Sequence, residues 1–472
     1  MKPLAVTLIA DPHYYSKKNW VDGDPYRFPP QREQQYKRGS EEIIRYVFDE
    51  VCRDGAPDII LINGDLTNNG EVTSHEEMRA LLRKLKSRGK RVYVTTATHD
   101  YANGGNGFSY GFDKDNREVL VPALQREQLY DYYFEFGLNE ALSVHLPSMS
   151  YTVKLNEDYL LLALNDDVGK QQCGFTDDCF LWIEQQVRQA QANGQFVVAM
   201  THHPVLAPSV LYRLIAPGDV LEDGEETAKR FADLGIPCIL TGHSHIHNIS
   251  SVKSESGNLL YDVSTASVIG YPPYYRRITF DPEQCAIAVS SVLLDRIPGL
   301  DTDGLSLSDF TKKLFLGNIS DIFTFAETDY EQFSELAIGF SMPKEKSHRL
   351  KPVLRPAAKY INRLTFGRIW RFSRRTSAVT RQEMQLVKAE KVLPFAIEMI
   401  ANLFKGDAAL QGTSQADAVK YAIAVGFFQH LDKRAKPFHK KLQSLGIESI
   451  AATVHPLLQN DGLGDAEAIL HY

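Results

Sequence analysis

The chain has 472 residues, which is too long for one ordinary domain and fits two or three domains, or one large catalytic domain with an addition. With 43% hydrophobic and 24% charged residues, it has the composition of a folded protein, which excludes a disordered chain. The net charge of −7 is mild. No apolar run approaches the ~18–20 residues that cross a bilayer, so we expect no transmembrane segment.

The cysteines and the N-terminal residues bear on the compartment. The five cysteines are odd in number and no two form a C-x-x-C pair, so neither a disulfide framework nor a thiolate zinc site is predicted. The apolar start leads into Asp11-Pro12-His13 with no small-residue cleavage site, so no signal peptide is predicted. We therefore expect a cytoplasmic protein.

The first 297 residues alternate short apolar runs with helical periods, which predicts an α/β sheet with helices on both faces. Apolar residues recur at helical spacing from Ile44 to Val51 and from Met78 to Leu85. The expected strands are Ala5–Ala10, Ile59–Ile62, Val92–Val94, Leu160–Leu164, Val197–Met200, Cys238–Leu240, Leu259–Val263, Arg277–Phe280 and Ala286–Leu294.

After residue 297 the strand signals stop. Val392–Lys405, Ala416–Leu431 and Phe438–Leu445 have helical periods. We therefore expect two domains, a catalytic domain over residues 1–297 and an all-α C-terminal domain over residues 298–472.

The second part contains a strongly basic segment. Between Lys344 and Lys391 there are 14 Lys and Arg against 3 Glu, a net charge of +11, so the rest of the chain carries −18. Such a segment is typical of a nucleic-acid patch, an interfacial membrane helix or a positive wall that steers anionic substrates. It is equally typical of a solvated helix face whose charges meet an acidic catalytic domain. We favour this last interpretation and expect no nucleic-acid partner.

Carboxylates and imidazoles follow five of the predicted strands. The five segments are Asp11-Pro12-His13, Asn63-Gly64-Asp65, Thr98-His99-Asp100, His202-His203-Pro204 and Gly242-His243-Ser244-His245. Because ligands bind at the carboxyl ends of the strands in an open α/β sheet, we expect these segments to converge on one rim. One such motif would mean little, but the recurrence at five strand ends indicates a site.

The side chains of this set suit divalent metals. Carboxylate oxygens and imidazole nitrogens are ligands for Mn, Fe, Zn or Co, and there are too many of them for one ion. Gly64 allows the tight turn that a carboxylate shared between two ions would need at Asp65. Two ions about 3.5–4 Å apart are a common device for displacement at phosphorus. The sequence therefore predicts two divalent metal ions and a small phosphoester substrate.

The chain contains, in this order, the motifs Asp-x-His, Gly-Asp, His-Asp, His-x-Pro and Gly-His-x-His. This series resembles the motifs of the calcineurin-like metallophosphoesterase superfamily, and the resemblance spans about residues 4–295. The run from Gly64 to Glu71 resembles the cyclic-nucleotide phosphodiesterase (class III) branch, and the helical C-terminal part is similar to that of a subset of its bacterial members. The resemblance implies a four-layer β-sandwich flanked by helices, in place of one doubly wound sheet, with the dimetal site on loops at one end.

The resemblance also implies roles for the residues of the site. One metal would be held by Asp11, His13 and His245, the second by His202 and His243, and both by the bridging Asp65. A hydroxide that bridges the metals would attack phosphorus, and His99 would be the general acid for the leaving oxygen. Asp100 would bond to His99 and fix its tautomer. The implied activity is hydrolysis of cyclic nucleotides or related small nucleotide diesters.

One position departs from the family pattern. The pattern Gly-Asn-His-[Asp/Glu] reads Ala97-Thr98-His99-Asp100 in this chain. The Asn oxygen normally binds the second metal, and the shorter hydroxyl of Thr98 is a poorer ligand. Two alternatives therefore stay open: a phosphomonoesterase, and a degenerate metal-binding scaffold. A scaffold has no need for a general acid, so the intact His99 favours an enzyme.

Four further residues complete the predicted surroundings of the site. Asn68 and His247 are candidate substrate contacts, because they lie close in sequence to Asp65 and His245. His203 is expected to point away from the site, and His75 is expected to face solvent. The sequence does not predict an oligomeric state.

Overall fold

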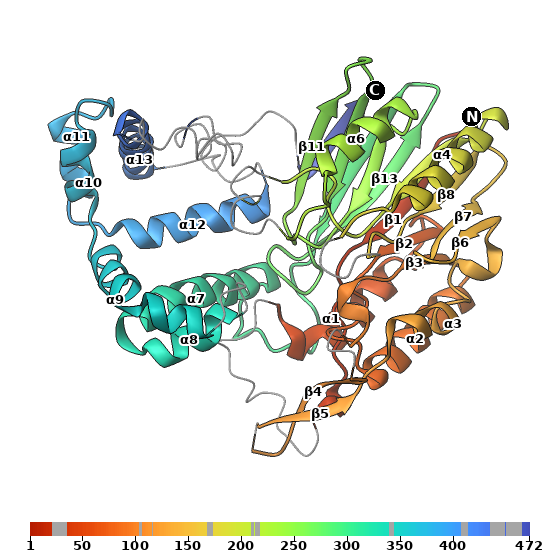
Figure 1. Cartoon of the computed structure of the whole chain (residues 1–472), viewed down its shortest axis with the longest axis horizontal. Coiled ribbons are helices and arrows are strands. Elements are labelled where there is room, and N and C mark those ends of the chain that lie inside the picture. Colours follow the sequence, from red (N-terminus) through yellow and green to blue (C-terminus); the bar gives the residue numbers. More distant parts are fainter. Residues whose placement is uncertain are drawn as a thin grey trace.

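The structure is a computed structural model of the chain. It describes residues 1–20, 35–102, 106–115, 117–167, 173–208, 212, 218–338, 344–406, 414–434, 449 and 465–472. Its strands form two large sheets and one hairpin, and the sheets lie face to face (Figure 1).

The first sheet has six strands in the order β15-β14-β13-β1-β2-β3. Their bounds are β1 Leu4–Ile9, β2 Ile59–Asn63, β3 Arg91–Thr95, β13 Tyr274–Asp281, β14 Ala286–Leu293 and β15 Glu467–His471. The strands β1, β2 and β3 run parallel, with Val6 opposite Ile59 and Ile60 opposite Val92. Their carboxyl ends therefore meet at one rim of this sheet.

The second sheet has seven strands in the order β11-β12-β10-β9-β8-β7-β6. Their bounds are β6 Ser143–His145, β7 Ser150–Lys154, β8 Tyr159–Ala163, β9 Phe196–Met200, β10 Cys238–Thr241, β11 Asn248–Lys253 and β12 Leu259–Ser264. Here β8, β9, β10 and β12 are parallel. A separate hairpin pairs β4 (Phe108–Phe112) with β5 (Glu118–Pro122).

Alternate side chains of each sheet serve two different cores. On β2, Leu61 packs between the sheets, whereas Ile60 and Ile62 pack under the helices α1 (Ser40–Glu50) and α2 (Val72–Ser87). On β8, Leu161 faces the first sheet and Leu162 packs under α4 (Asp177–Ala192) and α6 (Gly224–Asp233). The layers are therefore helix, sheet, sheet, helix, which confirms the expected sandwich and replaces the single doubly wound sheet.

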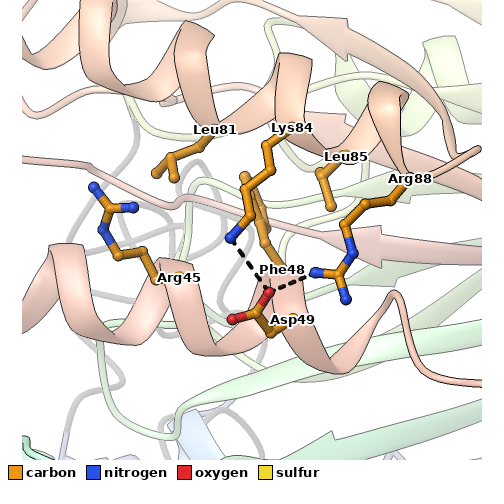
Figure 2. A pocket seen from close by; sticks show the side chains of 7 residues that line it. All are labelled: Arg45, Phe48, Asp49, Leu81, Lys84, Leu85 and Arg88. Carbon is orange, nitrogen blue, oxygen red and sulfur yellow. Dashed lines mark hydrogen bonds and ion pairs between the residues drawn. The ribbon is translucent and has the colours of Figure 1, made fainter.

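The helix layer over the first sheet is held by packing rather than by charge. Figure 2 shows α1 beside α2, where Phe48 lies against Leu81 and Leu85 in a small pocket. Asp49 bridges the helices through Arg88 at 2.5 Å and Lys84 at 3.6 Å. These charged groups are exposed, so the apolar contacts supply most of the stabilisation.

The described residues after 297 are mainly helical, as predicted. The helices are α7 Leu307–Thr328, α8 Tyr330–Ile338, α9 Lys344–Ile361, α10 Phe366–Ser373, α11 Arg381–Val387, α12 Val392–Lys405 and α13 Gln415–Arg434. A short helix α3 (Leu129–Tyr132) belongs to the sandwich part. The predicted helix Phe438–Leu445 lies outside the described residues. No described helix is both long and apolar enough to span a membrane.

The end of the chain corrects the expectation of an all-α second part. Strand β15 pairs antiparallel with β14, and Leu470 is buried between the two sheets. This five-residue strand carries only two large apolar side chains, Ile469 and Leu470, so its sequence gives no strand signal. The chain thus leaves the sandwich after β14 and returns to it at the C-terminus.

The helical part also contacts the loop that follows β10. The backbone N–H of His247 donates to the carbonyl oxygen of Phe404 at the end of α12, at 3.0 Å. Tyr271 packs with Phe315 of α7 and Ala401 of α12. In Figure 1, α7 and α12 reach from the other helices toward the sandwich. This contact falls two residues after His245.

A buried arginine ties the C-terminal strand to the sandwich, and its loss should destabilise the protein. Arg276 is fully buried and donates to the carbonyl oxygens of Ser264 and Asp465 at 3.0 and 2.6 Å. We expect Arg276→Leu to lower the free energy of unfolding by at least about 1–3 kcal/mol, because buried carbonyl acceptors lose their donor. Urea unfolding measures this, with exposed Arg277→Leu as the control. Equal losses in both variants would contradict this role.

Candidate metal centre

The five predicted segments follow the carboxyl ends of β1, β2, β3, β9 and β10. Contacts between them join both sheets. The Nε2 atoms of His13 and His245 are 3.2 Å apart, and Nε2 of His202 is 3.2 Å from Oδ2 of Asp65. The convergence expected from the sequence is therefore present at one end of the sandwich.

The backbone at this rim is strained at the expected ligands. Nine non-glycine residues in the described part have a positive φ, and five of them are predicted metal ligands: Asp11, His13, Asp65, His243 and His245, with φ between 41° and 59°. Such conformations are costly and concentrate at functional sites. Gly64 precedes Asp65 with φ 107°, and a Cβ there would lie 2.5 Å from Nδ1 of His202. Only glycine fits this turn.

Two groups of potential ligands lie side by side. The first group is Asp11, His13 and His245, whose ligand atoms all lie within 4.8 Å of one another, and the second contains His202 and His243. The ligand atoms of Asp11, Asp65 and His202 also lie within 4.8 Å of one another. Nδ1 of His243 lies 3.2 Å from Nε2 of His202. Oδ2 of Asp65 is 3.5 Å from Nε2 of His13 and 3.2 Å from Nε2 of His202. Asp65 therefore stands between the groups, where a shared carboxylate would have to stand.

The proton equilibria of these groups differ. Burial alone would lower the pKa of His202, but the neighbouring carboxylates, Asp65 foremost, raise it to about 10, so a cation that binds there would displace a proton. Burial holds the pKa of His13 and His243 well below the usual range, so both are neutral as metal ligands must be. Burial alone would raise the pKa of Asp65, but the neighbouring imidazoles, His202 foremost, hold it well below its usual range. Nδ1 of His13 is buried without a hydrogen-bond partner among the described residues. The donor set suits Mn, Fe or Zn.

Further hydrogen bonds orient the candidate metal ligands. Nδ1 of His202 donates to the carbonyl oxygen of Asn63 at 2.9 Å, which leaves Nε2 for a metal. The backbone N–H of His243 donates to both carboxylate oxygens of Asp11 at 3.0 Å. The backbone N–H of His99 donates to Oδ1 of Asp65 at 3.1 Å. Backbone groups thus hold both carboxylates in place.

The partner of His99 differs from the prediction. Its Nδ1 lies 2.7 Å from the carbonyl oxygen of Asn68 and 2.8 Å from Oδ1 of Asn69, so Nδ1–H donates and Nε2 is left to exchange a proton. The His99 ring lies 5.0 Å from that of His13. The orienting groups are therefore Asn68 and Asn69, which follow the expected bridging residue in the sequence.

Asp100 is a buried structural carboxylate rather than the partner of His99. It accepts from the backbone N–H groups of Thr67 and Ala97, both at 2.9 Å. Burial and the charge of Asp65 raise its pKa to about 8. Asp100 closes the 3-10 turn Thr98–Asp100, in which successive side chains diverge, so adjacency in sequence did not mean contact. It joins the loop after Asp65 to the loop that carries His99.

Neither candidate substrate contact has a free side chain. Asn68 is buried and its Nδ2 donates to Oε1 of Glu71 at 3.0 Å, so it acts on His99 through its carbonyl oxygen. His247 is fully buried, with Nε2 at 2.7 Å from Oγ of Ser291 and its ring stacked on Tyr274. Both are corrected to structural residues. Half-buried Thr98 begins the 3-10 turn beside His99.

His75 is also buried, against expectation. Its Nε2–H donates to the carbonyl oxygen of Asp100 at 2.9 Å, and its Nδ1 accepts from the hydroxyl of Tyr133 at 2.6 Å. The spacing of His75 with Met78 and Leu82 places it on the buried face of α2, which the helical period could have shown. His75 thus stabilises the 3-10 turn Thr98–Asp100 through its hydrogen bond to the carbonyl oxygen of Asp100.

Acid should destabilise the protein through His75. Burial lowers its pKa to about 3, whereas in the unfolded chain it is about 6.5. Below pH about 6.5 the unfolded chain binds a proton that the native state does not, so stability falls toward pH 3 by about 1.4 kcal/mol per unit. We expect His75→Gln to flatten this slope in urea unfolding at several pH values. Partly exposed His348→Gln should keep it, and an unchanged slope in His75→Gln would contradict the assignment.

The two-sheet sandwich and the Asp and His side chains clustered at its rim are the features expected of the metallophosphoesterase class. The chain belongs to the calcineurin-like phosphoesterase family, whose model matches residues 4–247. No curated protein matches the chain.

Several solved structures are similar in fold. A dimetal phosphatase from Danio rerio is 14% identical, with 61% of this chain and 95% of that chain covered and a TM-score of 0.44. A purple acid phosphatase from yellow lupin is 13% identical, with coverage of 62% and 52% and a TM-score of 0.37. GAP50 of Plasmodium, an anchor in the inner membrane complex, is 9% identical, with coverage of 67% and 95% and a TM-score of 0.32. At such low similarity these likenesses carry no argument about activity.

Proposed function

We propose that the protein is a dimetal-dependent phosphodiesterase that acts on cyclic nucleotides or related small nucleotide diesters. The observation that carries the proposal is the position of Asp65, whose Oδ2 lies within 3.5 Å of imidazole nitrogens from both ligand groups. Asp11, His13 and His245 would hold one ion, His202 and His243 the other, and Asp65 both. Bound divalent ions supply Lewis acidity, which acidifies water and neutralises charge on phosphoryl oxygens.

His99 is the proposed proton donor. The hydrogen bonds from Nδ1 to Asn68 and Asn69 fix the ring and leave Nε2 to protonate the leaving oxygen. The backbone N–H of His99 also holds Asp65, so the donor and the bridging carboxylate keep a constant relation. A binding scaffold would not require a positioned proton donor, which favours an enzyme.

The preference for nucleotide diesters rests on the run from Gly64 to Glu71. This run resembles the cyclic-nucleotide branch, and in the structure it supplies both groups that orient His99. Attack of water on such a diester breaks one P–O bond and expels an alkoxide, which needs a proton, so an oriented donor suits this substrate class. An alkyl monoester makes the same demand, so the preference for diesters rests on the resemblance of this run. The second candidate function is hydrolysis of phosphomonoesters.

Rates on paired chromogenic substrates test the proposal. The 472-residue chain is stripped of metal, supplied with Mn²⁺ and assayed with bis(4-nitrophenyl) phosphate and 4-nitrophenyl phosphate. We expect the diester to be hydrolysed with the higher kcat/KM, and cyclic nucleotides to compete with it. A higher kcat/KM on the monoester would favour the phosphomonoesterase, and no turnover of either would favour the scaffold.

The substitution Thr98→Asn should strengthen the second metal site. A carboxamide oxygen reaches further and is a better ligand than a hydroxyl, so we expect Mn²⁺ to bind at least about tenfold more tightly at the second equivalent, with a higher rate at limiting Mn²⁺. Isothermal titration measures the affinity, and Thr98→Val is the control for side-chain volume. Unchanged titration in Thr98→Asn would show that residue 98 does not reach the metal.

A further inference from the structure

His203 lies beside the second ligand group and not away from it. It is buried, and its ring centroid lies 4.0 Å from that of His243 and 4.9 Å from that of His202. We propose that His203 is a further ligand of the second metal site, an inference that rests on the proposed dimetal function. The two residues already expected at that site are its nearest aromatic neighbours.

The three imidazoles are close enough to share one ion. His202, His203 and His243 each offer a nitrogen within 4.8 Å of the other two. Metal–nitrogen distances of about 2.0–2.1 Å allow ligand atoms on one ion to be up to about 4.2 Å apart. A small movement of the side chains would therefore bring all three nitrogens within bonding distance of one ion. The set of three is separate from the group formed by Asp11, His13 and His245.

The carboxylate of Asp166 orients His203 as a metal ligand would be oriented. Nδ1 of His203 lies 2.8 Å from Oδ1 of Asp166, and Oδ2 of Asp166 accepts from the backbone N–H of His203 at 2.8 Å and from the hydroxyl of Thr201 at 2.7 Å. Residue 203 is therefore held at its backbone and at its ring, and Nδ1 is the ring nitrogen that donates to Asp166, which directs Nε2 to other partners. Histidines that bind metals typically donate their other ring nitrogen to such a group.

Two buried histidines outside the ligand groups use both ring nitrogens in hydrogen bonds. His145 contacts Ser148 and Asp178, and His75 contacts Tyr133 and the carbonyl oxygen of Asp100. His203 differs, since within the described part of the chain nothing hydrogen-bonds to its Nε2. With His203, the second site has Asp65 and three imidazoles, and each site has four protein donors.

Metal titration of the 472-residue chain tests this inference. Mn²⁺ is added to metal-stripped protein in a calorimeter, and the affinity of each equivalent is measured. We expect His203→Ala to weaken the second equivalent at least about a hundredfold and Asp166→Asn to weaken it about 10–100-fold, with the first equivalent unchanged. The control is His145→Ala, which removes a buried, carboxylate-paired imidazole outside the ligand groups and should bind both equivalents as the wild type does.

Cobalt gives a second readout that does not depend on turnover. We expect the visible absorption of the Co²⁺ protein to change at the second equivalent in His203→Ala, because a nitrogen donor is lost. Wild-type affinities and an unchanged Co²⁺ spectrum would overturn the inference; if His203→Ala fails to fold, the nearly isosteric Asp166→Asn decides by the same criteria. Two bound equivalents without ester hydrolysis in the wild type would instead contradict the proposed function.

Discussion

Asp65→Asn is expected to abolish hydrolysis, with a fall in kcat of at least about a thousandfold. The carboxylate of Asp65 touches both ligand groups, and an amide cannot supply negative charge to two cations. Loss of one preorganised group at a reaction centre typically costs ~10²–10³ in kcat, and this substitution weakens two metal sites at once. Both the rate and the Mn²⁺ stoichiometry should therefore drop.

The matched control flanks the same strand, β2. Asp58 precedes β2 at the opposite end, where its side chain is 83% exposed, so Asp58→Asn should keep the rate and the two equivalents. Circular dichroism establishes that both variants are folded. An Asp65→Asn protein that binds two Mn²⁺ with wild-type affinity would contradict the bridging role.

His99→Ala is expected to separate chemistry from metal binding. We predict that kcat for a diester with an alkoxide leaving group falls by about 10²–10⁴, because the leaving oxygen loses its proton donor. The affinity for Mn²⁺ should be kept, since the contact of His99 with Asp65 uses the backbone N–H. The loss should be smaller for a nitrophenolate leaving group, which departs without a proton.

Asn69→Ala gives the graded comparison. It removes one of the two acceptors for Nδ1 of His99 and leaves the carbonyl oxygen of Asn68, so we expect a smaller loss of kcat than in His99→Ala. Steady-state rates with the two leaving groups measure both variants. Equal losses on both leaving groups in His99→Ala would show that His99 is not the proton donor.

The candidate ligands could be predicted because the ends of the strands can be recognised in the sequence. Apolar runs locate the parallel strands, and polar residues directly after them must lie at one rim. The left-handed backbone of Asp11, His13 and Asp65 could not be predicted, since Asp and His adopt φ > 0 more often than most residues but still only at a minority of positions.

Side-chain partners were harder to predict than positions. Asp100 was expected to hold His99 because the two are adjacent, yet the 3-10 turn directs Asp100 to Thr67 and Ala97. His203 was expected to point away from the site, but it pairs with Asp166, in the loop that follows β8, and its ring lies beside that of His243. Such contacts join segments far apart in the chain, and a single sequence does not show them.

For the fold as well, features that depend on neighbouring residues could be predicted, and features that depend on contacts between distant segments could not. The alternation of strands and helices predicts the layers of helices. The division into two sheets depends on which strands pair, and the local periodicity of the sequence does not predict strand pairing. The return of β15 to the first sheet is a further long-range event. Its five residues are too few for a clear period.

The rate of bis(4-nitrophenyl) phosphate hydrolysis against equivalents of Mn²⁺ tests the central claim most directly. The protein is first stripped of metal and then titrated, with bound metal measured in the same samples. The account predicts negligible turnover without metal and full activity only when two equivalents are bound. Turnover that persists in the stripped protein, or two bound equivalents with no turnover, would contradict the assignment of a dimetal phosphodiesterase.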